Sequence, residues 1–362
     1  MAALAMNIRG IPIAPFIPTI KKMKKFLLVG LLGLATLSAK AADAPAVTTL
    51  TGSGSSFVKP ILDKWADAYG KVDSSVTINY AGGGSGKGQT DILAPAVDFA
   101  GTDGPMTDAQ LKSAKGSILH LPVVAGAVVI VYNLPGVTGL KLDGPTLAGI
   151  YLGKITKWND KAIADLNPGL KLPAENITTV HRADKSGTTY IFTDYLANVS
   201  ADWKKDVGTA TGVEWPGTGQ GQNGSAGVAG QVEKTVGSIG YVELIYALSN
   251  KISFADMKNA SGKYITASLD AVSAALATAT IPADYRFSFV NAPGDKSYPI
   301  SGVTWLMVYQ ESKDAAKGKK LVSFLKWIYT DAAAKKMAAD LFYAPIPDVV
   351  TKRVLATIDT IK

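Results

Sequence analysis

Short runs of β-branched and apolar residues alternate along the chain with segments whose apolar residues recur at helical spacing. Thr48–Thr51 and Val76–Tyr80 have strand-like patterns, and between them apolar residues lie four apart from Phe57 to Tyr69, on one face of a helix. Pro122–Val131 is almost continuously apolar, as expected of a strand that is buried on both faces. The alternation predicts an α/β fold.

The same alternation continues to the C-terminus. Further strands are predicted at Val97–Ala100, Ile177–Val180, Ile239–Val242 and Val303–Tyr309, and further helices at Gln89–Leu93, Ile191–Val199 and Val322–Tyr329. The middle third is looser, and loops are predicted at Gly136–Pro145, at Asn167–Pro173 and, rich in Gly, Ser and Gln, at Trp215–Gly230. The last of these is interpreted as an exposed loop that leads into a helix.

Three turns rich in glycine or serine each follow a predicted strand and lead into a predicted helix. They are Gly52–Ser56, Gly82–Gly88 and Lys185–Thr188. Pro60 fits only the first turn of a helix, so the first helix is expected to begin close to Ser56. One such turn is usually only a helix cap, because Ser and Thr satisfy the first N–H groups. Three helix N-termini that point at one cleft would form an anion site.

Arg182 precedes the third turn, and its planar fork of donors suits a phosphate group. Asp103 follows the predicted strand Val97–Ala100 in a turn, where its ordinary role would be to cap the turn. A site built from helix N-termini and one arginine needs no large net charge. These residues predict a binding site for an oxyanion.

The first 41 residues have the pattern of a secretory signal peptide. Lys24 and Lys25 precede an apolar run, Phe26–Leu37, that is too short to span a bilayer, and Ala39-Lys40-Ala41 resembles a cleavage site. Residues 1–22 contain three prolines and are interpreted either as a mis-called start, with the true start at Met23, or as an unusually long n-region. A periplasmic protein is expected, since no cysteine is available for a lipid anchor.

Charge, cysteine and histidine exclude several classes of function. Six of the 37 basic residues and none of the 29 acidic ones lie in residues 1–41, which leaves 31 basic and 29 acidic side chains and no basic run for nucleic acid. The absence of cysteine excludes disulfides and thiol catalysis. With only His120 and His181, both interpreted as structural, no metal site is expected. The roughly 320 remaining residues favour two domains.

Several short motifs suggest alternative functions. Gly82–Gln89 resembles a P-loop but lacks its first glycine and its final Ser or Thr, and Gly219–Gly224 matches G-x-G-x-x-G but follows no predicted strand, so it is interpreted as a flexible loop. Ser56 and Lys59 match S-x-x-K, and Lys185–Gly187 resembles K-[ST]-G. A penicillin-interacting serine hydrolase therefore remains the enzymatic alternative, although its S-x-N element is missing.

The chain resembles the periplasmic phosphate-binding proteins of high-affinity ABC phosphate uptake systems. The similarity runs from about Thr48 to the C-terminus. The matching motifs keep their order and are Leu50–Phe57 (LTGSGSSF), Tyr80–Gly86 (YAGGGSG), Val97–Asp103 (VDFAGTD), Ile150–Asn159 (IYLGKITKWN), His181–Thr188 (HRADKSGT) and Gly237–Glu243 (GSIGYVE).

The resemblance implies a two-lobed binding protein, each lobe a sheet flanked by helices, with residues 42–124 and 298–362 in lobe I and residues 125–297 in lobe II. It implies a monomer without catalysis or cofactor, whose partners are inorganic phosphate and the transmembrane subunits of an ABC permease. The implied phosphate ligands are Ser56, Phe57, Ser85, Asp103, Arg182, Ser186, Gly187 and Thr188, and Asp184 is the implied orienting acid of Arg182. Ser56 stands where relatives often have Thr, so the hydroxyl is kept.

The chemistry of phosphate gives Asp103 a particular role. Near neutral pH phosphate carries at least one O–H and can donate a hydrogen bond, whereas sulfate can only accept. An ionised Asp103 would accept from phosphate but would face sulfate unpaired, which is costly for a buried charge. Arsenate has the same shape and protonation, and phosphonates are also oxyanions, so a binder of either remains open.

Overall fold

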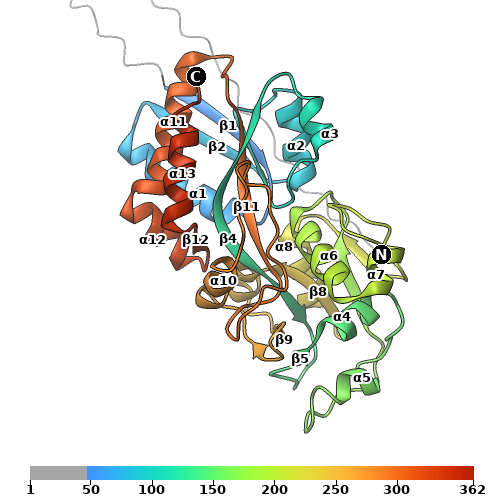
Figure 1. The fold of residues 1–362 in the computed structure, drawn as a ribbon. Coiled ribbons are helices and arrows are strands. Elements are labelled where there is room, and N and C mark those ends of the chain that lie inside the picture. The colour runs from blue at the N-terminus through green and yellow to red at the C-terminus, as the bar shows by residue number, and fades with distance from the viewer. Residues whose placement is uncertain (1–46) are drawn as a thin grey trace, which may run out of the picture. The chain divides into compact units, whose positions relative to one another are not determined.

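The computed structural model describes residues 47–362 and is drawn in Figure 1. The predicted signal peptide, residues 1–41, and the alternative start at Met23 lie outside the described residues. Among those described, no helix is long and apolar enough to cross a membrane.

The central feature is a mixed sheet of nine strands. Its order is β2 (Val76–Ala81), β1 (Thr48–Gly54), β3 (Phe99–Thr102), β11 (Ser301–Tyr309), β4 (Ile118–Tyr132), β8 (Ser238–Glu243), β6 (Thr178–Arg182) and β7 (Gln220–Gln222), and β12 (Ala344–Pro345) also pairs with β4. We call β2, β1, β3 and β11, with the helices packed on them, the first half of the sheet. Strands β8, β6 and β7, with their helices, form the second half.

Strand β4 joins the two halves. It has 15 residues and pairs antiparallel with β11 along Ile118–Ala127 and with β8 along Val128–Tyr132. All but one of its residues are buried, which confirms the prediction of a strand covered on both faces. Pro122 lies where the register between β4 and β11 shifts, as is usual for a proline inside a sheet.

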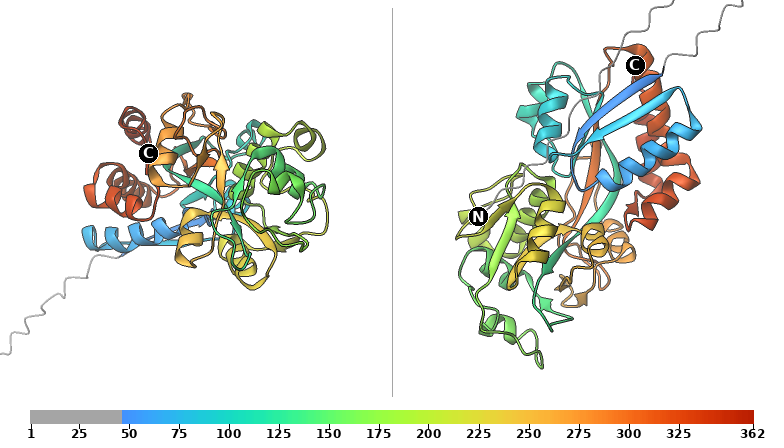
Figure 2. Two further views of the ribbon diagram at one scale, coloured as in Figure 1. Left: turned by 90° about the horizontal axis from the view of Figure 1, so that it is seen from below. Right: turned by 180° about the vertical axis from the view of Figure 1, so that it is seen from behind.

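Helices cover both halves. Figures 1 and 2 show α1 beside α11 and α12, and α13 packs against α11. The helices of the first half are α1 (Lys59–Val72), α2 (Ser85–Leu93), α3 (Asp108–Lys112), α11 (Ala315–Thr330), α12 (Ala332–Asp340) and α13 (Asp348–Ile358). The remaining helices are α4 (Gly144–Tyr151), α5 (Lys161–Ala164), α6 (Gly187–Val199), α7 (Ala201–Asp206), α8 (Gly224–Lys234), α9 (Leu244–Ser249) and α10 (Leu269–Leu276). A three-stranded sheet is formed by β10 (Tyr264–Ile265), β9 (Asp256–Lys258) and β5 (Lys141–Leu142).

The structure corrects several predicted boundaries. Helix α1 begins at Lys59 and not near Ser56, because β1 continues to Gly54 and Pro60 then occupies the first helical turn. Helix α2 begins at Ser85, so half of the second glycine-rich turn is helical. The boundary at residues 124/125 falls inside β4, and the division into two lobes at that point stays a prediction.

The predicted loops of the middle third contain regular structure. Residues 136–145 include β5 and the start of α4, and residues 215–230 include β7 and the start of α8. The motif at 219–224 is therefore not a flexible loop. Its Gly and Gln residues gave no strand pattern, yet β7 forms because Gln220–Gln222 pairs in parallel with Val180–Arg182.

Candidate functional site

The first half of the sheet brings its predicted site residues together at the ends of three parallel strands. Strand β1 pairs in parallel with both β2 and β3. The segment Ser55–Phe57 follows β1, Ser85 begins the helix after β2, and Asp103 follows β3. The carboxyl ends of parallel strands meet at one edge of a sheet, which is where α/β proteins usually place a ligand.

Asp103 is the electrostatic centre of this group, and its side chain is almost fully buried. Ser55 Oγ donates to its Oδ1 at 2.6 Å and Oδ2 at 2.7 Å, Thr304 Oγ1 donates to Oδ1 at 2.6 Å, and Ser85 Oγ lies 3.4 Å from Oδ2. Burial raises the pKa of Asp103 to about 6, although these hydrogen bonds and the charge of Arg182 oppose the rise. Sequence reasoning missed Ser55 and Thr304.

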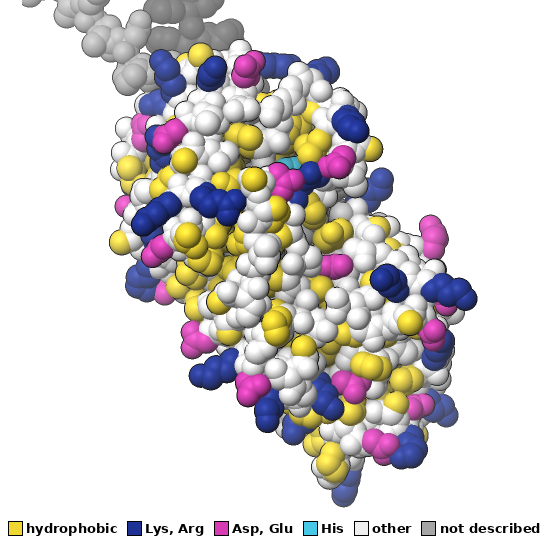
Figure 3. Space-filling view, in the orientation of Figure 1, with side chains coloured by type: hydrophobic (Ala, Val, Ile, Leu, Met, Phe, Trp, Pro, Cys, Tyr) yellow, Lys and Arg dark blue, Asp and Glu magenta, His cyan; other side chains and the backbone are white. Residues whose placement is uncertain are grey.

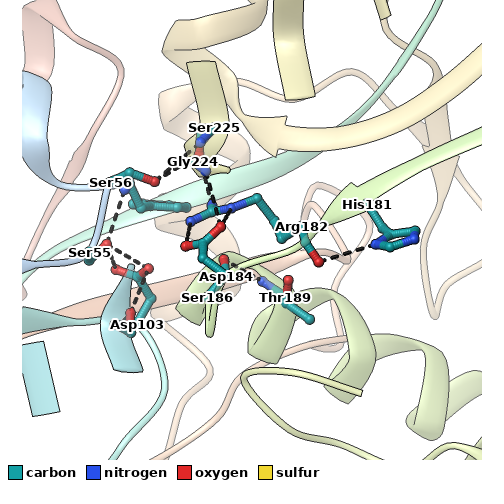
Figure 4. A network of polar contacts seen from close by, with 12 residues as sticks. Ser55, Ser56, Asp103, His181, Arg182, Asp184, Ser186, Thr189, Gly224 and Ser225 are labelled. Carbon is teal, nitrogen blue, oxygen red and sulfur yellow. Dashed lines mark hydrogen bonds and ion pairs between the residues drawn. The ribbon is translucent and has the colours of Figure 1, made fainter. Parts of the chain in front are cut away.

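The second half supplies the cation. Arg182 is the last residue of β6 and only 3% exposed. Its Nε donates to Asp184 Oδ1 at 2.7 Å and its Nη2 to Asp184 Oδ2 at 2.5 Å, as Figure 4 shows. Burial disfavours the charge of Asp184, but the hydrogen bonds and charge of Arg182, with the N–H of Gly224, lower its pKa. The predicted orienting contact between the two residues is therefore present.

The predicted turn Lys185–Thr188 opens α6. Ser186 is the N-cap and its Oγ accepts from the N–H of Thr189 at 3.2 Å, which is the ordinary capping role. Gly187 and Thr188 lie in the first helical turn, where backbone N–H groups have no partner within the helix. Thr188 Oγ1 is buried and has no hydrogen-bond partner among the described residues. A buried hydroxyl without a partner is costly, so it points to a bound group.

The two halves meet closely at these residues. A Cβ atom built on Gly187 would lie 2.6 Å from Asp103 Oδ2 and would overlap Ser85 Oγ. The N–H of Gly86 donates to the carbonyl of Lys185 at 2.9 Å across the junction. The structure therefore brings the eight residues predicted as phosphate ligands close together with Asp184, and Asp103 Oδ2 faces the first turn of α6.

Ser225 is a residue of the site that sequence reasoning missed. It lies in the first turn of α8, where its N–H and Oγ are each 3.3 Å from Ser56 Oγ, and Arg182 Nη1 is 3.4 Å from its Oγ (Figure 4). The signal was the pattern of the other three turns, glycines that lead directly into a helix. The sequence prediction of a loop at residues 215–230 does not single out Ser225.

The arrangement suits a single small oxyanion. The N-termini of α2, α6 and α8 meet with Arg182, and helix N-termini favour negative charge. The two carboxylates offset that one cation, so dipoles supply the remaining attraction. Elsewhere, Figure 3 shows Lys and Arg interspersed with Asp and Glu on the face it presents. Among residues 47–362, no group of three or more His, Asp or Glu side chains could hold a metal ion.

The other singled-out residues have structural contacts. His120 is buried, its Nε2 accepts from the N–H of Met106 at 3.2 Å, and burial lowers its pKa to about 4. The ring of His181 stacks on Trp215 with 4.7 Å between centroids. Lys59 Nζ lies 2.8 Å from Asp63 Oδ1, so this amine is paired with an acid and not with Ser56 as the S-x-x-K alternative requires.

Comparison with known proteins identifies the family of the chain. The family model of a PBP superfamily domain matches residues 39–332. Phosphate-binding protein PstS of Xylella fastidiosa is 40% identical over 320 residues, which cover 87% of this chain and 86% of the relative. The same-named protein of Pasteurella multocida is 40% identical over 312 residues, which cover 85% and 89%.

A solved structure shares the fold. It is that of PfluDING, a high-affinity periplasmic phosphate-binding protein bound with phosphate, with a TM-score of 0.70 at 21% identity over 85% of this chain and 93% of the other. The predicted two-lobed α/β fold of periplasmic binding proteins is thereby confirmed. The chain belongs to the PBP superfamily and, within it, to the family of phosphate-binding proteins named PstS.

Proposed function

We propose that this protein binds inorganic phosphate in the periplasm and delivers it to the transmembrane subunits of an ABC permease. The observation that carries the proposal is the position of Asp103, a buried acceptor that faces the first turn of α6, whereas the other carboxylate of the site, Asp184, is engaged by Arg182. The ligand of such a site must accept many hydrogen bonds and donate one, and a protonated tetrahedral oxyanion does both. The names of the relatives support phosphate as that anion.

The proposed contacts follow from the chemistry of each group. Phosphate oxygens accept from Arg182, from the hydroxyls of Ser56, Ser85, Ser186 and Thr188, and from the N–H groups of Phe57 and Gly187. Asp103 Oδ2 accepts a hydrogen bond from the O–H of phosphate. It is the less engaged of the two oxygens, because Ser55 and Thr304 lie 2.6 Å from Oδ1, whereas Ser55 and Ser85 lie 2.7 and 3.4 Å from Oδ2. Each bond to a charged group contributes about 1.5–3 kcal/mol. The protein catalyses no reaction on the anion.

Binding is proposed to be coupled to closure of the two lobes. Lobe I comprises residues 42–124 and 298–362 and lobe II residues 125–297, so each lobe supplies part of the site. A ligand that contacts both lobes stabilises the closed state by differential contact. The closed monomer then docks on the permease.

Titration calorimetry with a panel of oxyanions tests this function. Phosphate should bind far more tightly than sulfate. The affinities for arsenate and for a phosphonate show whether either of these anions is the preferred ligand. A chain that binds none of the four would refute the proposal. A penicillin-type reagent that labels Ser56 covalently would instead favour the serine hydrolase, and we expect no label.

Selectivity against sulfate should depend on pH through Asp103. Its pKa is raised to about 6, so above that pH the carboxylate repels sulfate, and below it the protonated acid can donate to sulfate. We expect sulfate affinity to rise about tenfold per unit as pH falls from about 8 to 6 and then to level off, since sulfate binding takes up one proton. Competition calorimetry against phosphate measures this.

Asp103→Asn is the matched variant for the pH experiment. The amide cannot ionise, so sulfate affinity should be higher at pH 8 than in the native protein and should not change with pH in this window. Phosphate affinity should fall, because the amide replaces one acceptor oxygen by a donor. Unchanged discrimination between the two anions in Asp103→Asn would remove Asp103 from its proposed role.

A further inference from the structure

Two tyrosines hold consecutive carbonyl groups of the segment that follows β1. Tyr246 Oη donates to the carbonyl of Ser56 at 2.7 Å, and Tyr343 Oη donates to the carbonyl of Phe57 at 2.5 Å. The side chain of Tyr343 is completely buried, and burial raises the pKa of both hydroxyls, so both remain donors. Neither tyrosine belongs to the predicted set of phosphate ligands.

The contact of Tyr246 bears directly on a proposed ligand. The carbonyl of Ser56 and the N–H of Phe57 belong to one planar trans peptide, in which they point in opposite directions. A hydrogen bond that fixes the direction of the carbonyl therefore also fixes the direction of the N–H. It also polarises that N–H, because hydrogen bonds along one chain of groups strengthen one another. In this structure the Phe57 N–H donates to Ser55 Oγ at 3.0 Å, and Ser55 Oγ in turn donates to Asp103.

Tyr246 reaches this peptide from the other half of the sheet. It lies in α9, whose N-cap is Glu243 at the end of β8, and Glu243 Oε2 accepts from the N–H of Ile245 at 3.1 Å. Tyr343 Oη lies 3.4 Å from the same oxygen. The buried carboxyl of Glu243 therefore contacts both Tyr343 and the first turn of the helix that carries Tyr246. Ser225 also reaches Ser56 from the second half, so both the hydroxyl and the carbonyl of Ser56 are held from there.

We propose that Tyr246 is a positioning residue, whose hydroxyl holds the Phe57 N–H on the side of Ser55 Oγ and Asp103, where it can donate to the bound anion, when the two halves close. The inference rests on the proposed function, because it assigns the Phe57 N–H as a phosphate donor. The Tyr246 bond forms between the halves, so it exists in the closed state only. Tyr343 holds the neighbouring carbonyl from within the first half and keeps the segment ordered in both states.

The test is Tyr246→Phe, which removes one oxygen and keeps the ring. Phosphate affinity should fall about tenfold, the effect of one hydrogen bond. The midpoint of thermal unfolding without phosphate should be unchanged, since the bond is absent from the open state. Tyr329→Phe is the matched control, because Tyr329 Oη donates to the carbonyl of Pro122 at 2.9 Å outside the site. It should leave phosphate affinity unchanged.

A spectroscopic readout separates positioning from a general structural effect. In nitrogen–proton correlation spectra, phosphate should shift the Phe57 amide strongly downfield in the native protein and much less in Tyr246→Phe, whereas the Gly187 amide should shift equally in both. An equal shift of the Phe57 amide in the variant, or native affinity, would overturn the inference. A native protein that binds no phosphate would instead overturn the proposed function, so the two failures are distinguishable.

Discussion

Arg182→Ala is expected to lower phosphate affinity by about 10²- to 10⁴-fold. Arg182 is the only cation proposed to contact the anion, and loss of two charge-assisted hydrogen bonds removes about 3–6 kcal/mol. The guanidinium is buried and Asp184 holds it by two nitrogens, so its remaining donors are already oriented before the anion arrives. Calorimetric titration of phosphate into the variant measures the loss.

The controls separate charge from geometry and from stability. Arg182→Lys keeps the charge but loses the planar fork, so its affinity should be intermediate. Arg286→Ala removes another partly buried, ion-paired arginine, whose partners are Asp108 and Asp284, and should bind phosphate like the native protein. Native affinity in Arg182→Ala would contradict the assignment of this residue to the site.

Gly86→Ala should weaken phosphate binding by tenfold or more without destabilising the ligand-free protein. Gly86 lies inside α2, where alanine is the better helix former by about 0.8–1 kcal/mol. Its added Cβ would overlap the Cβ of Lys185 on the other half, and Lys185 cannot relieve this by moving only the end of its side chain. The substitution therefore penalises the closed state alone, which lowers the apparent affinity.

Gly70→Ala is the matched control for this substitution. Gly70 also lies inside a helix, α1, but the added Cβ would meet only the carbonyl oxygen of Val76, at an ordinary contact distance of 3.9 Å. Both variants should have the native or a slightly higher midpoint of thermal unfolding, and only Gly86→Ala should lose affinity. Equal phosphate affinity in the two would show that binding does not require the approach of α2 to Lys185.

The predictions from sequence succeeded where one pattern dominated. The apolar run Pro122–Val131 predicts a buried strand and lies within β4, and the Ser-Gly-Thr turn after Arg182 predicts the start of a helix, which is α6. The pair Arg182 and Asp184 followed from the family motif and is present as an ion pair. These elements are encoded locally, so neighbouring residues were enough to identify them.

The rest of the site depends on contacts that are distant in sequence. Thr304 reaches Asp103 only because β11 lies beside β3, and no local pattern reports that pairing. Ser225 reaches Ser56 because β7, which precedes it, pairs with β6. The Gly and Gln residues of β7 show no hydrophobic alternation. Periodicity describes one element at a time, so partners that tertiary pairing supplies stay invisible to it.

The long strand β4 has a consequence for folding. Its first part is paired with β11 and its second part with β8, so neither half of the sheet is complete without residues that the other half also uses. A state with only one half folded would leave one end of β4 as a bare apolar edge, which invites aggregation. The two halves should therefore fold and unfold as one cooperative unit, even though we propose that they move apart to admit the ligand.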